Sequence, residues 1–594
     1  MLLNWIKLRT PLCRSLQRKR TLSTHRPTTV SPTTGNLWQV CVGIEIHAQL
    51  LTQTKLFSGA SAKFELDMPN TQVSFFDASI PGTLPALNTE CVDQAIRSAL
   101  ALQAQVHTHS TFERKHYFYA DLPLGYQITQ QDACIASNGS LHITVPKTRD
   151  NAQRFDVYER KIRITRLQLE QDSGKSMHDF DPTCSMIDLN RAGCALVEIV
   201  SEPDIRSSDE AACYVRNIQR LLRHVGTCDG NMEEGSLRCD VNISIRPNPR
   251  YEGQEEEEEE EEKEGGYMSG NNAVAKHPMG ERVEVKNLNS LRSVVKAIDY
   301  EVERQMYCAE VENAPVTTHE TRTFDVARGV TVRMRSKENA PDYRFLVDPD
   351  IPPLILEDGR IERIVNKLPE LPDAIRVRLT QQYELPLYDA SVLVEVPDAA
   401  EYYEEVMAQL TVEHSRVGES GEGKKNRKNK KDKKNKKDKK TENSVTKQTL
   451  NWITNELLGR MRPMHITFAT LRTGNSGMHG LTPSHVAAMV EAVLQGSISG
   501  KIAKAALDAV FEEGGVLAPM AVVEREGWAV VNDETLLLAM CRSVIENPSF
   551  VEQVAAVKST KPKLIGFFVG EVMKISKGQA DPGVVTKLLR ELLL

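Results

Sequence analysis

Several features that mark other protein classes are missing from this sequence of 594 residues. It has no run of about 20 mainly apolar residues, which a membrane-spanning helix needs, so a membrane channel is excluded and no membrane insertion is expected. Its 11 cysteines include no C-x-x-C pair, so we predict neither a zinc ribbon nor a thiol redox motif, and we expect a reducing compartment. No G-x-x-x-x-G-K-S/T loop occurs, so any use of ATP requires a fold other than the P-loop one.

Acidic residues are missing from the start of the chain. No Asp or Glu precedes Glu45, whereas residues 1–26 hold seven Lys or Arg among Leu, Ile, Trp, Ser and Thr. This composition is typical of an organelle transit peptide, and a disordered basic tail is the alternative interpretation. We therefore expect residues 1–35 to be a mitochondrial leader, and the mature protein to lie in the matrix.

Two runs of charge interrupt the rest of the chain. Residues 252–264 hold ten acids and one lysine, inside an acidic insertion expected over 252–280, and residues 419–442 hold twelve Lys or Arg and five acids. Such segments cannot bury enough apolar surface to fold, so we interpret both as surface insertions. The Lys-rich run could bind nucleic acid, but a solvated spacer is the favoured interpretation.

The hydrophobic pattern predicts an α+β protein. Residues 36–360 contain short alternating segments separated by Gly, Pro and Asn turns, which predicts an antiparallel sheet with a few helices. Helical periodicity follows over 361–445, with a disordered Lys-rich stretch expected at 418–442, and it returns over 446–594. In that last region, Thr482 and Asp581 each precede a proline, a sequence typical of a helix start.

Acidic side chains recur on strand-like segments whose opposite face is apolar. They are accompanied by one histidine, and the set is Glu45, His47, Glu170, Asp172, Glu198, Glu202, Asp240 and Glu284. Carboxylates that converge on one sheet face would suit a Mg²⁺–phosphate site, because Mg²⁺ prefers oxygen ligands. For any single strand, the solvated face of an antiparallel sheet is the alternative interpretation. The pattern alone therefore predicts a possible metal site and no more.

A candidate anion site follows the segment RVEVK. Ser290 is expected to cap a helix, and the buried stripe of that helix would be Leu291, Val294, Val295, Ile298 and Val302. The helix N-terminus, with Asn287 and Asn289, would then lie beside Glu284 and Lys286, a favourable place for an anion. Downstream basic residues could bind phosphate or carboxylate, with surface strand charges as an equal alternative: Arg333, Arg335, Lys337 and Arg344.

Ten segments make the sequence recognisable. In chain order they are VGIEIHAQL, KLFSG, PGTLPALN, HYFYADLPLGYQIT, LEQDSGK, LVEIVSEPD, GSLRCDVNIS, EVKNLNSLRSV, MRSKE and DYRFLVDPDIPPL. From Val42 to Pro353 the chain thus resembles the GatB/GatE family, the B subunits of glutamyl-tRNA(Gln) amidotransferases. The C-terminal GFFVGEVMKISKGQADPGVVTKLLRELL resembles the YqeY-like tail domain of that family. The resemblance implies a catalytic cradle domain at 36–360 and a tRNA-contacting tail at 446–594.

The resemblance also implies an activity. In this family the B subunit holds Glu-tRNA(Gln) and, with ATP and Mg²⁺, phosphorylates the glutamyl side-chain carboxylate. Ammonia, released from glutamine by an amidase A subunit, then displaces the phosphate to give Gln-tRNA(Gln), and a small C subunit holds the other two together. The absence of an amidase signature in this chain fits a protein that receives ammonia from elsewhere. The competing hypothesis is a non-catalytic tRNA-binding scaffold subunit of the same complex.

Individual roles are implied at matching positions. Metal binding is assigned to Glu45, His47, Glu170 and Glu198. Further catalytic roles fall to Asp240, Glu284 and Lys286, and nucleotide or phosphate contacts to Asn287, Asn289, Arg333, Arg335 and Lys337. No structural zinc is expected, because the positions that carry zinc-binding cysteines in many members are Ser58, Ala60, Ser74 and Asp77 here. Packing is expected to hold the loop 57–82 instead.

Overall fold

The computed structural model describes most of the chain. The described residues are 28–63, 68–146, 157–177, 183–247, 279–312, 319–336, 343–418, 445–474, 478–528 and 534–550, and, within 553–593, mainly 565–576 and 582–593. They divide into two compact units, which meet in the sequence between residues 371 and 372. Most of the expected leader, the poly-Glu run and the Lys-rich run lie outside the described residues.

The first unit carries all the strands that the structure describes. They are β1 (Thr28–Val30), β2 (Leu37–Gln49), β3 (Gln105–Val106), β4 (His109–Ser110), β5 (Glu113–His116), β6 (Tyr126–Thr129), β7 (Ala136–Pro146), β8 (Val157–Gln171), β9 (Lys175–Met177), β10 (Met186–Asp188), β11 (Ala195–Ser201), β12 (Leu237–Pro247), β13 (Val283–Leu288), β14 (Glu320–Asp325), β15 (Val330–Ser336), β16 (Phe345–Val347) and β17 (Leu354–Ile355). Its helices are α3 (Thr89–Ala101), α4 (Ser208–His224), α5 (Leu291–Glu310) and α6 (Arg360–Lys367).

A ten-stranded sheet dominates this unit, with the order β15-β14-β13-β12-β2-β11-β8-β7-β3 and with β1 paired to β2. The predicted α+β fold is confirmed, and every pair in this sheet is antiparallel except β13 with β14, which is parallel. The exception arises because α5 connects β13 to β14, and a helical crossover returns the chain in the same direction. The sheet includes Thr28–Val30, which fall inside the expected leader, and the bounds of that leader stay a prediction.

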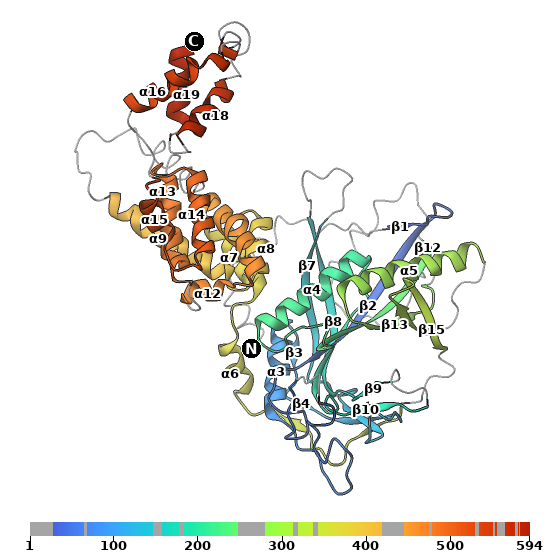
Figure 1. Ribbon diagram of the computed structural model, residues 1–594. Coiled ribbons are helices and arrows are strands. Elements are labelled where there is room, and N and C mark those ends of the chain that lie inside the picture. The colour runs from blue at the N-terminus through green and yellow to red at the C-terminus, as the bar shows by residue number, and fades with distance from the viewer. Residues whose placement is uncertain are drawn as a thin grey trace, which may run out of the picture. The chain divides into compact units, whose positions relative to one another are not determined.

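The alternation predicted for β2 is present. Val40, Val42, Ile44 and Ile46 are at most 2% exposed and face a core that also contains residues of α3, α4 and α5. These helices pack against the sheet, and α4 and α5 lie along it in Figure 1. Since helices cover one face, the other face is left for polar side chains.

Helix α5 begins as predicted at Ser290. The Ser290 hydroxyl accepts a hydrogen bond from the backbone N–H of Ser293, as an N-capping residue does. Val294, Ile298 and Val302 of the expected stripe are buried, so α5 is an amphipathic helix fixed on the sheet.

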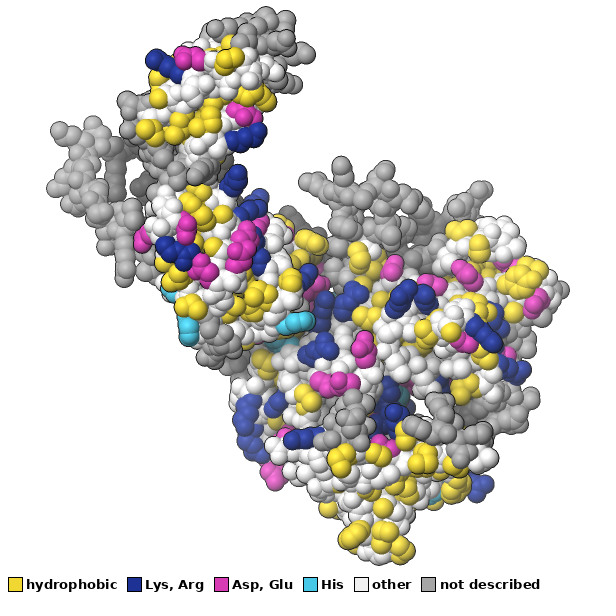
Figure 2. All heavy atoms as spheres, viewed as in Figure 1, with side chains coloured by type: hydrophobic (Ala, Val, Ile, Leu, Met, Phe, Trp, Pro, Cys, Tyr) yellow, Lys and Arg dark blue, Asp and Glu magenta, His cyan; other side chains and the backbone are white. Residues whose placement is uncertain are grey.

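The loop expected to be held by packing contains a buried ion pair as well. Lys55 Nζ lies 3.2 Å from Asp77 Oδ2, and both side chains are at most 1% exposed. The Ser58 hydroxyl and the Ser74 backbone N–H also donate to Asp77. The prediction that packing holds this loop was therefore incomplete. The buried Asp77 carboxylate also accepts hydrogen bonds from several parts of the loop. Phe75 in this loop and Leu84 just after it are exposed. Figure 2 shows hydrophobic side chains at the lower tip of the unit.

The second unit consists of helices in the residues that the structure describes. They are α7 (Pro372–Gln382), α8 (Leu387–Glu395), α9 (Ala399–Gly418), η2 (Trp452–Leu457), α11 (Leu458–Met461), η3 (Arg462–Met464), α12 (Phe468–Thr473), η5 (His479–Leu481), α13 (Pro483–Leu494), α14 (Gly500–Glu512), α15 (Pro519–Arg525), α16 (Glu534–Ile545), η6 (Pro548–Phe550), α18 (Ile565–Ile575) and α19 (Pro582–Leu593). Helices α13 and α19 begin at the predicted prolines.

Two apolar cores organise this second unit. One contains buried residues from Ile375 to Val523, and the other contains residues from Leu537 to Leu593. The first core includes residues on both sides of the expected domain boundary at 445/446, and that boundary stays a prediction. Within the described part of the chain, none of the helices combines the length and the apolar character that crossing a bilayer requires.

Candidate functional site

The polar face of the large sheet is built from neighbouring strands whose residues lie in register. On β2, His47 is paired with Glu198 of β11, and Glu45 is paired with Asp240 of β12. Glu284 of β13 is paired with Asn242 of β12. Because paired residues of adjacent strands point to the same face, the predicted acids of β11, β2, β12 and β13 meet there, together with Glu170 of β8.

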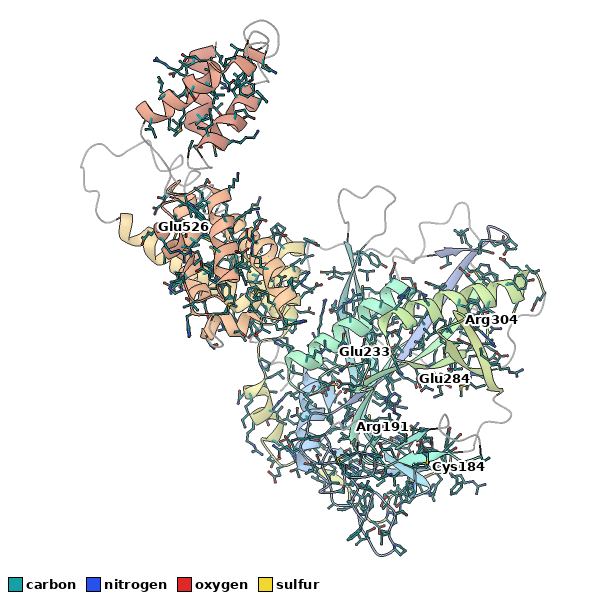
Figure 3. The ribbon with its side chains drawn as sticks, in the orientation of Figure 1. Cys184, Arg191, Glu233, Glu284, Arg304 and Glu526 are labelled. Carbon is teal, nitrogen blue, oxygen red and sulfur yellow. The ribbon has the colours of Figure 1, made fainter. Side chains whose placement is uncertain are left out.

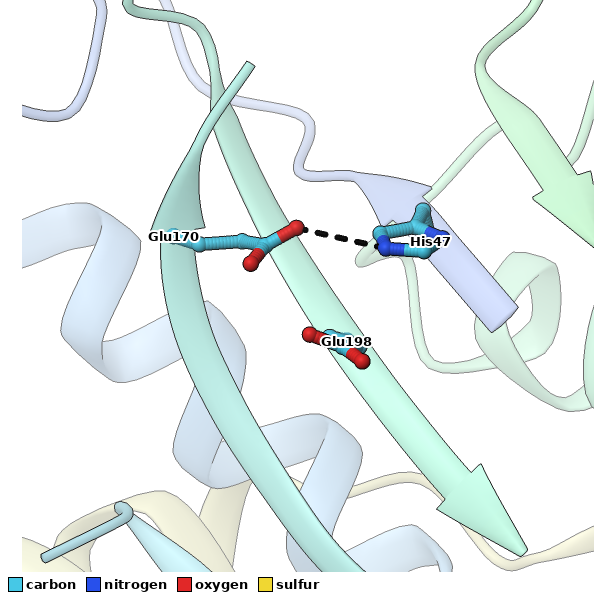
Figure 4. A group of neighbouring side chains, drawn as sticks. All are labelled: His47, Glu170 and Glu198. Atoms are coloured by element: carbon cyan, nitrogen blue, oxygen red, sulfur yellow. Dashed lines mark ion pairs between the residues drawn. The ribbon is translucent and has the colours of Figure 1, made fainter. Parts of the chain in front are cut away.

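One cluster on this face contains His47, Glu170 and Glu198, shown in Figure 4. Each residue offers one ligand atom, and these atoms all lie within 4.8 Å of one another. His47 Nε2 is 3.4 Å from Glu170 Oε1, the ion pair drawn in the figure. Two side chains support the carboxylates: Gln168 Nε2 donates to Glu198 Oε2 at 2.6 Å, and Thr129 Oγ1 donates to Glu170 Oε2 at 3.3 Å. We call these three residues the histidine cluster.

Burial gives the histidine cluster unusual electrostatics. Glu170 and Glu198 are 3% and 8% exposed. Burial, and after it the nearby charge of Glu198, raise the pKa of Glu170 to about 7, against the opposing effect of His47. For His47 burial lowers the pKa, but the carboxylates of Glu198, Glu170 and Asp240 outweigh burial, so its pKa is raised overall. Two buried carboxylates side by side are costly unless positive charge neutralises them.

A second cluster contains Glu45, Asp240 and Glu284, whose ligand atoms also lie within 4.8 Å of one another. Lys286 Nζ lies 3.2 Å from Asp240 Oδ2 and 2.9 Å from Glu284 Oε1. The pKa of Lys286 is raised, since Asp240 and Glu284 outweigh the effect of burial. Burial raises the pKa of Glu45, and the charges of Glu198, Glu284 and Asp240 add to this effect. Figure 3 labels Glu284 on this face. We call this group the lysine cluster.

The two clusters differ in their fitness for a metal ion. In the lysine cluster, the Lys286 ammonium group already forms ion pairs with two carboxylates. In the histidine cluster, the only ion pair among the residues that the structure describes is the long His47–Glu170 contact. Two carboxylates and one imidazole within chelating distance fit a divalent cation such as Mg²⁺ or Mn²⁺, with coordination positions left for water or phosphate. The histidine cluster is therefore the better candidate metal centre.

A β-bulge shapes the end of β13. The register with β12 shifts between Cys239 and Val241, which face Leu288 and Val285, so β13 has one extra residue there. Asn287 has a left-handed conformation with φ 62°, and its backbone N–H donates to Asp240 Oδ1 at 3.0 Å. The extra residue returns Leu288 to the apolar face while the backbone N–H of Asn287 binds a cluster carboxylate, as bulges beside active sites often do.

The predicted site residues thus fall into separate groups. Glu45 lies in the lysine cluster rather than with the other three predicted metal ligands. Asn287 and Asn289 are exposed beside it. Arg333 is paired with Arg322 in the register and lies 3.8 Å from Glu320, on the face covered by α5, so the structure does not bring it to the polar face.

Three further basic residues were predicted as possible phosphate contacts, and the structure describes two of them. Arg335 is in register with Thr321, whose hydroxyl donates to Glu284 at 3.2 Å, which places this position at the edge of the polar face. Lys337 lies outside the described residues. Arg344 precedes β16 and is exposed, and its backbone carbonyl lies 2.7 Å from His116 Nδ1.

Arg238 belongs to this face although no role was predicted for it. It is paired with His47 in the register, and its Nη2 donates to Asp172 Oδ2 at 2.7 Å. The nearby charge of Asp172, above all, raises its pKa against the effect of burial. Its buried Nε has no hydrogen-bond partner among the described residues. The alternating pattern of β12 could have predicted this position, because Arg238 is two residues from Asp240 and so lies on the same face of the strand.

Comparisons with known proteins agree with this architecture. The GatB/GatE catalytic domain matches residues 40–362, and a GatB domain named GatB_Yqey matches residues 435–593. The chain is 41% identical to the B subunit of the mitochondrial glutamyl-tRNA(Gln) amidotransferase of Phytophthora infestans, over 94% of this chain and 96% of that protein. It is also 41% identical to the B subunit of the aspartyl/glutamyl-tRNA(Asn/Gln) amidotransferase of Rickettsia felis, over 94% of this chain and 98% of the relative. Because it shares these domains and is similar over almost its full length, the chain belongs to the GatB/GatE family.

Proposed function

We propose that this chain is the B subunit of a mitochondrial glutamyl-tRNA(Gln) amidotransferase and that it converts Glu-tRNA(Gln) into Gln-tRNA(Gln). The observation that carries the proposal is the histidine cluster, in which the ligand atoms of His47 and of the buried Glu170 and Glu198 lie within 4.8 Å of one another on the polar sheet face. A protein that only held tRNA would have no use for two adjacent buried carboxylates, because they lower the stability of the fold. The enzyme is therefore favoured over the scaffold.

The histidine cluster would hold Mg²⁺. The cation would neutralise phosphate oxygens during transfer from ATP to the glutamyl carboxylate, which gives that carboxyl group a good leaving group for ammonia. Gln168 and Thr129 orient the two carboxylates through hydrogen bonds, which keeps the ligand atoms converged. His47 must be neutral to act as a ligand, so metal binding would displace its proton.

The lysine cluster would serve the second half of the reaction. Its carboxylates accept hydrogen bonds from any ammonium or ammonia that reaches the sheet face, and Lys286 limits their net negative charge. Glu45 and Asp240 are in register on adjacent strands, so they can hold or move a proton between them. The ammonia would come from an amidase A subunit, and a small C subunit would be a further partner, in the mitochondrial matrix.

The experiment uses the complex of this chain with its A and C subunits. Glu-tRNA(Gln), glutamine, ATP and Mg²⁺ should yield Gln-tRNA(Gln) with the wild-type chain, and Glu45→Gln should abolish this product while tRNA binding survives. The matched control is Glu202→Gln, since Glu202 follows β11 outside both clusters and accepts a hydrogen bond from the Thr165 hydroxyl. Loss of tRNA binding with Glu45→Gln, or normal activity of that variant, would contradict the proposal.

A further inference from the structure

An aromatic surface lies at the end of a small sheet beside the candidate metal centre. Strands β16, β5 and β6 form this three-stranded sheet, and Tyr117, Phe118 and Tyr119 directly follow β5. Phe118 is 86% exposed and Tyr119 is 55% exposed, in a chain with only 6% aromatic residues. Exposed aromatic side chains that gather at one place usually mark a binding surface.

The aromatic rings form an ordered group. The ring centroids of Tyr117 and Tyr119 are 5.5 Å apart, and those of Tyr117 and Tyr343 are 5.8 Å apart, both edge to face. The backbone N–H of Tyr117 donates to the carbonyl of Gly125, and a Cβ on Gly125 would come within 3.2 Å of the Phe118 ring. Glycine at that position therefore leaves room for the Phe118 ring against the turn. We call Tyr117, Phe118, Tyr119 and Tyr343 the aromatic surface.

Positive charge accompanies the aromatic surface. Lys115 Nζ lies 5.1 Å from the centroid of the Tyr343 ring, a cation–π contact, and the structure shows no carboxylate in ion-pair distance of Lys115 among its described residues. Its neighbour Arg114 differs, because it is paired with both Asp348 and Asp350. The charge of Lys115 also lowers the pKa of Glu170, so this lysine lies between the rings and the histidine cluster. A cation beside aromatic rings is the combination that binds an unpaired nucleic-acid strand.

Strand β6 connects the aromatic surface to the histidine cluster. At one end of β6, Tyr126 is in register with His116, the residue before Tyr117, and at its other end Thr129 donates to Glu170. Three residues of strand separate these ends, or about 10 Å. The charge of Glu170 contributes, after burial, to the raised pKa of Tyr117, which fits this proximity. The span is comparable to the reach of a glutamyl ester on a terminal nucleotide.

We propose that the aromatic surface, with Lys115, binds the unpaired 3′-terminal nucleotides of the aminoacylated tRNA by stacking their bases. This inference rests on the proposed function and names a subsite for its substrate. The glutamyl group is esterified to the terminal ribose, so the last bases must lie near the histidine cluster when the carboxylate reacts. Unpaired bases expose both ring faces, and Phe118 and Tyr119 offer partners for them, while Lys115 contacts a phosphate between them.

The test measures tRNA binding to the assembled complex by fluorescence anisotropy at one fixed salt concentration. The probes are deacylated tRNA(Gln) and the same tRNA without its last three nucleotides. The Phe118→Ala/Tyr119→Ala double variant should bind intact tRNA roughly tenfold more weakly and should bind truncated tRNA as the wild type does. Repeated over a range of salt concentrations, Lys115→Met should reduce the salt dependence of binding by about one phosphate contact. The matched control is Tyr307→Ala, an exposed tyrosine on α5.

Three outcomes would overturn the proposal. Equal weakening with intact and truncated tRNA would place the bound segment elsewhere on the tRNA. A raised KM for ATP with unchanged tRNA binding would assign the surface to the adenine of ATP. Failure of the variant to assemble, with an unchanged thermal midpoint of the isolated chain, would make the surface an interface with another protein of the complex. Because the binding assay needs no turnover, it gives a result even if Glu45→Gln shows that the proposed activity is wrong.

Discussion

Glu301 on α5 and Glu170 on β8 are both buried glutamates of the first unit, on opposite faces of the same sheet. Glu301 is fully buried and accepts bonds from Arg304 at 2.6 Å, Gln305 at 3.0 Å and Thr331 at 2.8 Å. Glu170 is 3% exposed, yet its contacts with His47 at 3.4 Å and Thr129 at 3.3 Å are longer, and its neighbour Glu198 is a second carboxylate. Figure 3 labels Arg304 on the helix side. The two glutamates are therefore similarly buried, but Glu301 has much closer positively charged and hydrogen-bonding partners than Glu170.

This difference distinguishes carboxylates that are paired within the fold from carboxylates that the fold leaves without a full positive partner, as a proposed metal site would require. On the helix side, Arg304 and Arg322 surround Glu301, and Glu320 lies near both arginines. On the polar side, the carboxylates of the histidine cluster lie next to one another, and burial raises the pKa of Glu170 to about 7. Buried titratable groups whose pKa is shifted by burial and by neighbouring like charges are often found at functional sites.

The largest effect on stability is expected from Glu301→Gln. The change removes the negative charge while Arg304 and Arg322 remain, so buried positive charge loses its main partner. We expect the free energy of unfolding of the first unit to fall by about 3 kcal/mol. Urea denaturation of the chain measures it. Restored stability in Glu301→Gln combined with Arg304→Met would support the pairing argument, and an unchanged midpoint in the single variant would contradict it.

Glu170→Gln should show the opposite behaviour. The substitution removes one of two repelling buried carboxylates, so the thermal midpoint of the metal-free chain should stay unchanged or rise. Formation of Gln-tRNA should fall by at least about a hundredfold, because the proposed metal site loses one of its ligands. The rate per folded molecule is measured in the assembled complex, with Glu301→Gln as the comparison. A marked loss of stability would show that Glu170 holds the fold as Glu301 does.

Divalent cations should distinguish the two faces directly. A hundredfold excess of Mn²⁺ over its Kd should stabilise the wild-type chain by about 3 kcal/mol, because an ion held by the proposed site would bind the folded chain and not the unfolded one. Glu198→Gln should abolish this increase in a thermal-shift assay, while Glu301→Gln should keep it. If Glu198→Gln retained the full shift, the cation would bind elsewhere.

Arg333→Ala should have the smallest effect. This side chain is 53% exposed and lies 3.8 Å from Glu320, so the pair is weak and solvent-screened. We expect less than about 1 kcal/mol of destabilisation and no more than about a twofold change in the KM for ATP. Steady-state kinetics against ATP provide the measurement. A larger rise in KM would restore the role first predicted for Arg333.

The alternation of apolar and polar residues predicted much of the sheet, because this pattern repeats every two residues and depends only on near neighbours in the chain. Strand β2 alternates between apolar residues such as Ile44 and Ile46 and polar residues such as Glu45 and His47, as the sequence indicates. The capping residue Ser290 and the apolar stripe of α5 were also predictable, since both depend on near neighbours. The bulge at Asn287 was not, because an extra residue in β13 is defined only by its pairing with β12.

The amino-acid sequence by itself determined which side chains share a face of each strand, where the helices begin, and which family the chain resembles. The tertiary structure alone decided that β2 lies between β11 and β12, and so that His47 joins Glu198 while Glu45 joins Asp240. It also placed Arg333 behind the sheet. The physical reason is that alternation acts between neighbours in the chain, whereas the order of strands depends on backbone hydrogen bonds between segments far apart in sequence.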